Sequence, residues 1–96
     1  MMSMTAKLAR ELKFLGVPVV SYSDPDSDCP FLVDSAIYLD EDHHVQVGDG
    51  YIYLIRRLEN GCFEDLYEIT SFVGANSAAL IIAAAYFKDV NSRRFA

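Results

Sequence analysis

The sequence predicts an α+β domain in which an antiparallel β-meander of four to five strands packs on one face against an N-terminal and a C-terminal helix. The prediction depends on three patterns: an amphipathic periodicity at the N-terminus, several strand-like runs separated by turn residues, and an alanine-rich run near the C-terminus. The chain has 96 residues, of which 52% are hydrophobic, enough for one modest core. We therefore expect a single domain over residues 1–90 and a flexible tail over residues 91–96.

The first segment has the spacing of an amphipathic helix. Its apolar residues recur at Met4, Leu8, Leu12 and Leu15. Ser3 or Thr5 can cap the start of the helix, and Gly16 can end it. Because the residue before a proline avoids helical geometry, the Val17-Pro18 pair predicts that the chain continues as a short strand over residues 17–22.

Three further strand-like runs cover residues 35–40, 45–47 and 51–58. The Asn60-Gly61 pair that follows predicts a two-residue hairpin turn, because both residues tolerate a positive φ. Counting outward from this turn pairs Arg57 with Glu64, Arg56 with Asp65, Leu54 with Tyr67, Tyr53 with Glu68 and Ile52 with Ile69. The same register assigns to the core face Ile52, Leu54, Leu58, Phe63, Tyr67 and Ile69, and to the other face Tyr53, Arg57, Glu64 and Glu68.

A second helix is predicted near the C-terminus, with Asn76 or Ser77 as its cap. Residues 78–87 are all apolar, so this helix is expected to be buried on more than one side. Because so small a domain can cover only one side, we expect a second copy of the chain to cover another. The alternative is that an alanine strip, formed by Ala75, Ala79 and Ala83 at every fourth residue, packs on the sheet and the bulky side chains fill the core. The predicted homodimer interface consists of Ala79, Leu80, Ala83, Tyr86 and Phe87.

Charge is distributed unevenly along the chain. Fourteen Asp and Glu outnumber eight Lys and Arg, for a net charge of −6, and no Lys or Arg lies between Phe14 and Ile55. A negative surface repels phosphate backbones and anionic lipids, so direct binding to nucleic acid or to a membrane is not expected. A basic protein is the expected partner besides a second copy. The predicted partner-binding residues are the acids of two loops: Asp24, Asp26, Asp28, Asp40, Glu41 and Asp42.

The acids at positions 24, 26 and 28 have the spacing of a calcium-binding loop. Such a loop also needs glycine at its sixth position and glutamate at its twelfth. This chain has Cys29 and Ser35 at those positions, and Pro25 and Pro30 favour an ordinary bend. We therefore expect a solvated acidic loop rather than a calcium site.

His43 and His44 follow the second acidic group, but adjacent residues of a strand point to opposite faces and are not expected to share a metal. The two cysteines, Cys29 and Cys62, lack the close spacing of zinc ligands and are expected to be free thiols. Neither a nucleophile–base arrangement nor a phosphate-binding loop is recognisable. We expect no metal, no cofactor and no enzymatic activity.

The N-terminus lacks the apolar stretch of a secretory signal, and residues 78–87 are too short to cross a membrane, so a cytoplasmic location is expected. The sequence thus favours a small acidic, non-catalytic interaction domain. Two alternatives remain open: an inhibitor that mimics nucleic acid and blocks a nucleic-acid-binding protein, and a domain that binds a small ligand or a cation. Tyrosines on a sheet face would suit a recognition surface, and Tyr53 beside Arg57 is the strongest candidate. The alternative is that half-buried tyrosines simply pack well on a pleated surface.

Overall fold

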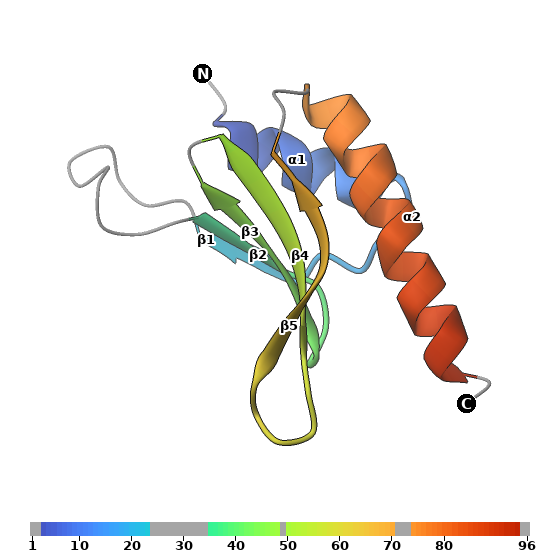
Figure 1. Cartoon of the computed structure of the whole chain (residues 1–96). Helices are drawn as coiled ribbons and strands as arrows, with labels where there is room; N and C mark the ends of the chain where they lie inside the picture. The colour runs from blue at the N-terminus through green and yellow to red at the C-terminus, as the bar shows by residue number, and fades with distance from the viewer. Residues whose placement is uncertain (1–2, 24–34, 49, 71–73, 95–96) are drawn as a thin grey trace.

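A computed structural model describes residues 3–23, 35–48, 50–70 and 74–94 (Figure 1). Its elements are α1 (Met4–Phe14), β1 (Ser21–Ser23), β2 (Ser35–Tyr38), β3 (His43–Gly48), β4 (Tyr51–Arg57), β5 (Phe63–Ile69) and α2 (Ala75–Arg94). The strands form one antiparallel sheet in the order β1-β2-β3-β4-β5, so each strand pairs with the next one along the chain. This arrangement confirms the predicted α+β class and the meander.

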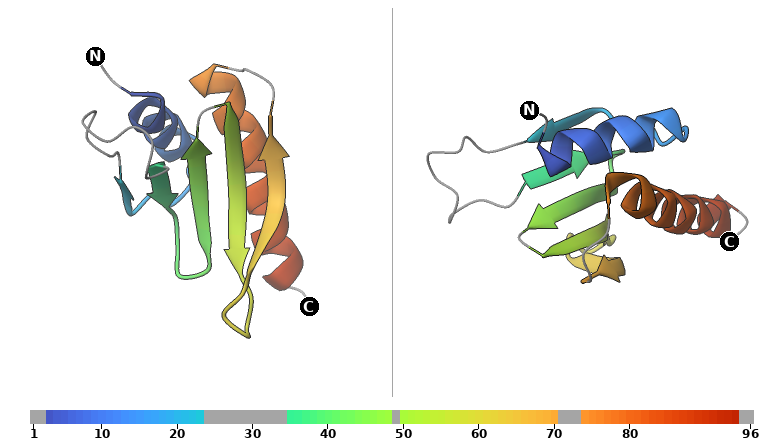
Figure 2. Two further views of the ribbon diagram at one scale, coloured as in Figure 1. Left: turned by 60° about the vertical axis from the view of Figure 1, so that its left-hand side comes forward. Right: turned by 90° about the horizontal axis from the view of Figure 1, so that it is seen from above.

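Both helices lie side by side on one face of the sheet (Figure 2). The core fills the space between them and the sheet, and its largest fully buried side chains are Leu8, Leu12, Val17, Ile37, Leu39, Val45, Leu54 and Ile82. No helix in the described part of the chain covers the opposite face, which we call the open face. Neither helix, over the residues that the structure describes, is long and apolar enough to span a membrane.

The N-terminal helix forms as its sequence predicts. The side-chain oxygen of Ser3 accepts a hydrogen bond from the amide of Ala6 at 3.1 Å, which satisfies a donor that the first turn would otherwise leave free. The helix ends before Gly16, whose φ of 90° only glycine adopts without strain. The following strand is shorter than predicted, because β1 begins at Ser21, beyond Pro18, which has no amide to donate to a neighbouring strand.

The turn between β4 and β5 differs from the predicted one. Its loop has three residues, because the amide of Gly61 donates to the carbonyl of Leu58 at 2.9 Å and the amide of Leu58 donates to the carbonyl of Cys62 at 2.7 Å. Gly61 has a positive φ of 85° but Asn60 does not, which is the arrangement of a type I turn followed by a glycine bulge. The side chain of Asn60 accepts the amide of Cys62 instead, at 3.0 Å. The pairing next to the turn is therefore one residue away from the predicted register.

A bulge restores the predicted register further along the hairpin. Leu54 pairs with Tyr67 but Ile55 pairs with Asp65, so Leu66 is an extra residue of β5. Beyond the bulge the predicted pairs are present, namely Ile52–Ile69, Tyr53–Glu68 and Leu54–Tyr67. Between the bulge and the turn the prediction was wrong, since the observed pairs are Arg56–Glu64 and Arg57–Phe63. The shift brings Glu64 to the helix-covered face and leaves Phe63, predicted in the core, 63% exposed.

Candidate functional site

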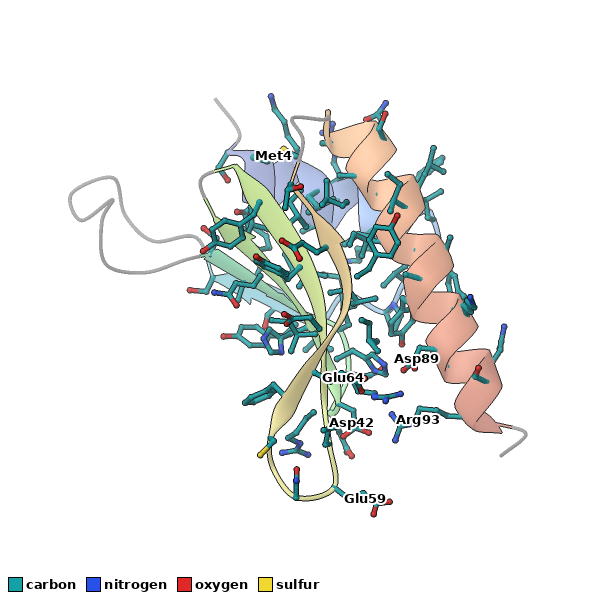
Figure 3. The ribbon with its side chains drawn as sticks, viewed as in Figure 1. Met4, Asp42, Glu59, Glu64, Asp89 and Arg93 are labelled. Atoms are coloured by element: carbon teal, nitrogen blue, oxygen red, sulfur yellow. The ribbon has the colours of Figure 1, made fainter. Side chains whose placement is uncertain are left out.

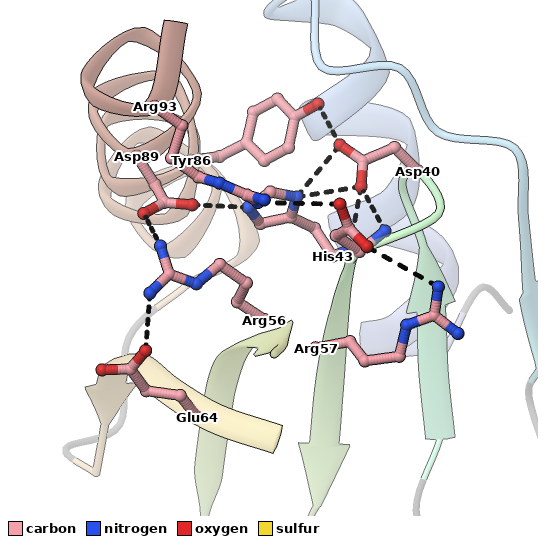
Figure 4. Close-up of polar contacts among 9 residues, drawn as sticks. Asp40, His43, Arg56, Arg57, Glu64, Tyr86, Asp89 and Arg93 are labelled. Atoms are coloured by element: carbon pink, nitrogen blue, oxygen red, sulfur yellow. Dashed lines mark hydrogen bonds and ion pairs between the residues drawn. The ribbon is translucent and has the colours of Figure 1, made fainter. Parts of the chain in front are cut away.

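A cluster of charged residues joins the sheet to the second half of α2. Strand pairing places His43, Arg56 and Glu64 in a row across β3, β4 and β5 on the helix-covered face. Figure 3 shows Glu64 and Asp89 between the β4–β5 hairpin and α2, and Arg56 bonds to both of them. The charged cluster, drawn in Figure 4, consists of Asp40, His43, Arg56, Glu64, Tyr86 and Asp89.

His43 occupies the centre of this cluster and is only 4% exposed. Its Nδ1 lies 2.9 and 3.0 Å from the two carboxylate oxygens of Asp40, and its Nε2 lies 2.7 Å from Oδ2 of Asp89. An ionised carboxylate only accepts hydrogen bonds, so both contacts are satisfied together when the ring carries a proton on each nitrogen. The geometry therefore fits an imidazolium held between two carboxylates.

Alternating charges continue outward from Asp89. Its Oδ1 accepts a hydrogen bond from Nη1 of Arg56 at 2.6 Å, and Nη2 of Arg56 donates to Oε2 of Glu64 at 2.7 Å. The side chains of Asp89 and Arg56 are largely buried, whereas Glu64 faces water. Among the described residues, no buried side-chain nitrogen or oxygen lacks a hydrogen-bond partner. Because its members satisfy one another, the cluster is suited to fastening α2 onto the sheet.

Asp40 receives several hydrogen bonds. Burial raises the pKa of its carboxyl group, but hydrogen bonds from His43, from the amide of Asp42 and from Tyr86 outweigh burial, and the pKa is lower than its ordinary value. The Tyr86 hydroxyl donates to Oδ2 of Asp40 at 2.8 Å. Burial, together with this hydrogen bond and the negative charge of Asp40, raises the pKa of Tyr86. The pair is therefore ionised at Asp40 and neutral at Tyr86 near neutral pH.

Replacing Tyr86 with phenylalanine is expected to destabilise the protein at neutral pH by an amount that shrinks in acid. The stabilisation from ionised Asp40 is present above its ordinary pKa of 3.8 and is lost as pH falls through its lowered folded-state value. Without the Tyr86 donor, the folded-state pKa of Asp40 rises towards its ordinary value, so this stabilisation is smaller. Stability at neutral pH therefore falls by about 1 kcal/mol, and the difference from the wild type shrinks as pH falls below 3.8. Urea unfolding over a series of acidic pH values measures both effects. An unchanged acid profile in Tyr86→Phe, or an equal change in the control Tyr67→Phe, would contradict the role of the hydroxyl.

The second predicted acidic loop is a tight turn between β2 and β3. Oδ1 of Asp40 accepts the amides of Asp42 and His43, each at 2.8 Å, which fixes the backbone of the turn. Asp42 lies 3.7 Å from Arg57 and 3.6 Å from Arg93. Of the three acids predicted here, Asp40 is thus held inside the charged cluster, Asp42 faces two arginines, and Glu41 is exposed. The first loop, with Asp24, Asp26 and Asp28, lies outside the described residues.

The five residues of the predicted dimer interface fall into two groups. Ala79, Ala83 and Tyr86 are buried within the chain's own core. Leu80 is 60% exposed and Phe87 is 37% exposed. Ala79 and Ala83 therefore let the helix approach the rest of its own chain closely, and of these five residues only Leu80 and Phe87 are free to contact another molecule. The dimer itself stays a prediction.

The open face carries a row of three aromatic rings, Tyr38, His44 and Phe63, which we call the aromatic row. The ring centroids of Tyr38 and His44 are 6.2 Å apart, and those of His44 and Phe63 are 5.6 Å apart with the rings nearly perpendicular. Ile55, which precedes Arg56 on β4, is buried although it points to this face. Burial lowers the pKa of His44, so this ring is neutral at neutral pH.

Tyr53, predicted as a recognition position beside Arg57, also lies on the open face. Its hydroxyl donates to Oε1 of Glu68 at 3.1 Å, and this hydrogen bond raises the pKa of Tyr53. The ring of Tyr51 lies 5.0 Å from that of Tyr53, measured between centroids. Tyr53 is thus tied to Glu68, its partner across the two strands, and the exposed aromatic surface centres on Tyr38 and Phe63 instead.

The two adjacent histidines point to opposite faces, as strand alternation predicts: His43 contacts Asp89 of α2, and His44 contacts rings of the open face. Within the described ranges, no group of three or more His, Cys, Asp or Glu side chains is arranged to hold a metal ion. Cys62 is a free, exposed thiol, and Cys29 lies outside the described residues.

The sequence did not reveal the charged cluster, because its members are far apart along the chain. One signal was available: Asp89 is the only acid in α2, and it follows a long apolar run, so a partner for it could have been sought. Another was the i, i+3 spacing of Asp40 and His43 around a turn. Comparison with protein-family models, with curated proteins and with solved structures found no match to this chain.

Proposed function

We propose that this chain is a non-catalytic protein-interaction domain that forms a homodimer through α2 and presents the acidic turn at residues 40–42 to a basic partner. The observation that supports the dimer most directly is a line of exposed, uncharged residues along α2. This α2 stripe consists of Asn76, Leu80, Ala84, Phe87 and Asn91. The spacing of three or four residues keeps all five on one side of the helix.

A second copy is a suitable occupant of the α2 stripe because the stripe can complement itself. When two helices cross antiparallel at Ala84, Leu80 of one copy lies near Phe87 of the other. At this crossing Lys88 lies level with Leu80 of the partner helix and Arg93 with its uncharged N-terminal turn, so the basic residues do not approach each other. Fully burying an exposed leucine or phenylalanine side chain contributes about 1.5–3 kcal/mol. Leu80 and Phe87 are 60% and 37% exposed, so each contributes a fraction of this value towards the cost of association.

The charge of the chain supports a basic partner at the acidic turn. The net charge of the chain is −6, and Glu41 is exposed at the acidic turn. The hydrogen bonds from backbone amides to Asp40 hold this turn in one conformation, so binding it costs little further ordering. A negative, pre-ordered turn attracts a positively charged protein and raises its association rate.

Replacing Leu80 with aspartate is expected to weaken self-association at least about tenfold, because the change removes the apolar contact with Phe87 of the partner helix and takes a carboxylate out of water at the interface. Analytical ultracentrifugation over a concentration series measures the change. The matched control is Val20→Asp, since Val20 is also an exposed apolar residue but lies outside α2. A wild-type chain that stays monomeric at high micromolar concentration would contradict the proposed dimer, as would equal effects of the two substitutions.

A further inference from the structure

We infer that a hollow beside the aromatic row binds the guanidinium group of an arginine from the basic partner. The inference deepens the proposed function by naming the chemistry of that partner, and it is independent of the dimer. The hollow lies on the open face, where Tyr38, His44 and Phe63 line it together with Glu41, Asp42 and Arg57. Tyr38 and Phe63 are both largely exposed, so their ring faces are available to an incoming group.

The geometry of the aromatic row suits a flat cation. His44 lies between the other two rings, tilted by 35° against Tyr38 and by 87° against Phe63, so the row presents ring surfaces in two orientations. A guanidinium group is planar, weakly hydrated and stacks on aromatic faces. The neutral state of His44 matters here, because a protonated ring would repel a cation.

The charges around the hollow also favour a cation over an anion. By strand pairing, the open face carries Asp65 and Glu68 on β5, and Glu41 and Asp42 lie at its end. Of the described residues that line the hollow, Arg57 is the only Lys or Arg, and it already lies 3.7 Å from Asp42. The side chains around the hollow therefore carry a net negative charge. An incoming arginine gains both a carboxylate neighbour and an aromatic surface.

The test uses a short peptide of alternating arginine and serine, compared with the same peptide in which citrulline replaces arginine. Citrulline has nearly the shape of arginine but no charge, so a difference in binding measures the guanidinium charge. We expect the arginine peptide to bind and to shift the NMR signals of Tyr38, His44 and Phe63, and the citrulline peptide to leave them in place. Equal shifts with both peptides, or none with either, would overturn the inference.

Variants locate the binding on the protein. Phe63→Ala is expected to weaken binding of the arginine peptide about twofold to fivefold. Glu41→Gln on its own is also expected to weaken binding, and its effect should be larger at low ionic strength. Tyr67→Ala is the matched control, because Tyr67 and Tyr38 are equally exposed but Tyr67 does not line the hollow. Glu11→Gln on α1 controls for the general loss of one negative charge. Unchanged thermal unfolding of Phe63→Ala would confirm that its exposed ring is dispensable for folding.

The outcomes separate this inference from the proposed function. If Glu41→Gln weakens binding but Phe63→Ala acts no differently from Tyr67→Ala, the acidic turn binds the basic peptide and the inference about the hollow is wrong. If Phe63→Ala weakens binding but Glu41→Gln acts no differently from Glu11→Gln, the hollow is supported and the role of the acidic turn is wrong. The dimer is judged separately, by the mass of the wild-type protein.

Discussion

Replacing His43 with leucine is expected to lower the free energy of unfolding by about 3–5 kcal/mol, the cost of removing one member of a buried ion pair. Leucine fills a similar volume but removes the two ring nitrogens that bond Asp40 and Asp89. These two carboxylates would then face each other across an apolar side chain, and Asp89 would keep Arg56 as its one partner among the residues that the structure describes. Because domains of this kind are stabilised by only about 5–15 kcal/mol in total, the variant is expected to be close to unfolding.

Urea unfolding of the purified variant measures this loss. His44→Leu is the matched control, because it changes the adjacent residue in the same way on the open face, where His44 has ring contacts but no ion pair among those the structure describes. A double-mutant cycle of His43→Leu with Asp89→Asn is expected to show strong coupling, since each change removes part of the same pair. Equal losses for the two histidine variants, or additive effects in the cycle, would mean that the charged cluster does not fasten α2.

The second large effect is expected at Ala79, on the buried side of α2. Ala79→Leu should lower stability by about 1–3 kcal/mol, because three further carbon atoms must fit into a core that already contains Leu8, Leu12 and Ile82. The substitution leaves the α2 stripe unchanged, so it is not expected to weaken self-association of the folded protein. Thermal unfolding and sedimentation of the same sample measure the two quantities.

Ala84→Leu is the control for this prediction. It makes the same change on the same helix at an exposed position of the α2 stripe, where the cost should stay within about 0.5 kcal/mol. If Ala79→Leu is tolerated as well as Ala84→Leu, the alanine strip does not pack against the core as the structure indicates.

Local patterns were sufficient to predict most of the fold. The i, i+4 spacing of α1 and its Ser3 cap are properties of a few neighbouring residues, and so are the turn formers between the strands. The register of the β4–β5 hairpin failed because Asn60-Gly61 is compatible both with a two-residue turn and with the last two positions of a three-residue loop. A bulge at Leu66 then corrected the shift, and nothing in the alternation of β5 marks that residue as the extra one.

The candidate site was less predictable, for a different reason. The acidic turn was recognised, but the roles of its members were not, because the partners of Asp40 and His43 on α2 lie 46 residues away. The composition of α2 also did not predict which of its faces packs against the sheet, because residues 78–87 are apolar all round. The structure resolves this through packing, since small Ala79 and Ala83 face inward while bulky Leu80 faces water.

The bulge in β5 has a consequence for how copies of this chain can meet. A sheet that ends in an unpaired strand invites aggregation by addition of further strands. In this molecule the terminal strand β5 is distorted at Leu66, and an antiparallel copy centred there would set Glu64 against Glu68 of its neighbour, a repulsive pairing. The other terminal strand, β1, is only three residues long. Growth by edge-to-edge polymerisation is therefore disfavoured at both ends of the sheet, which leaves its faces and its helices as the surfaces for orderly contact.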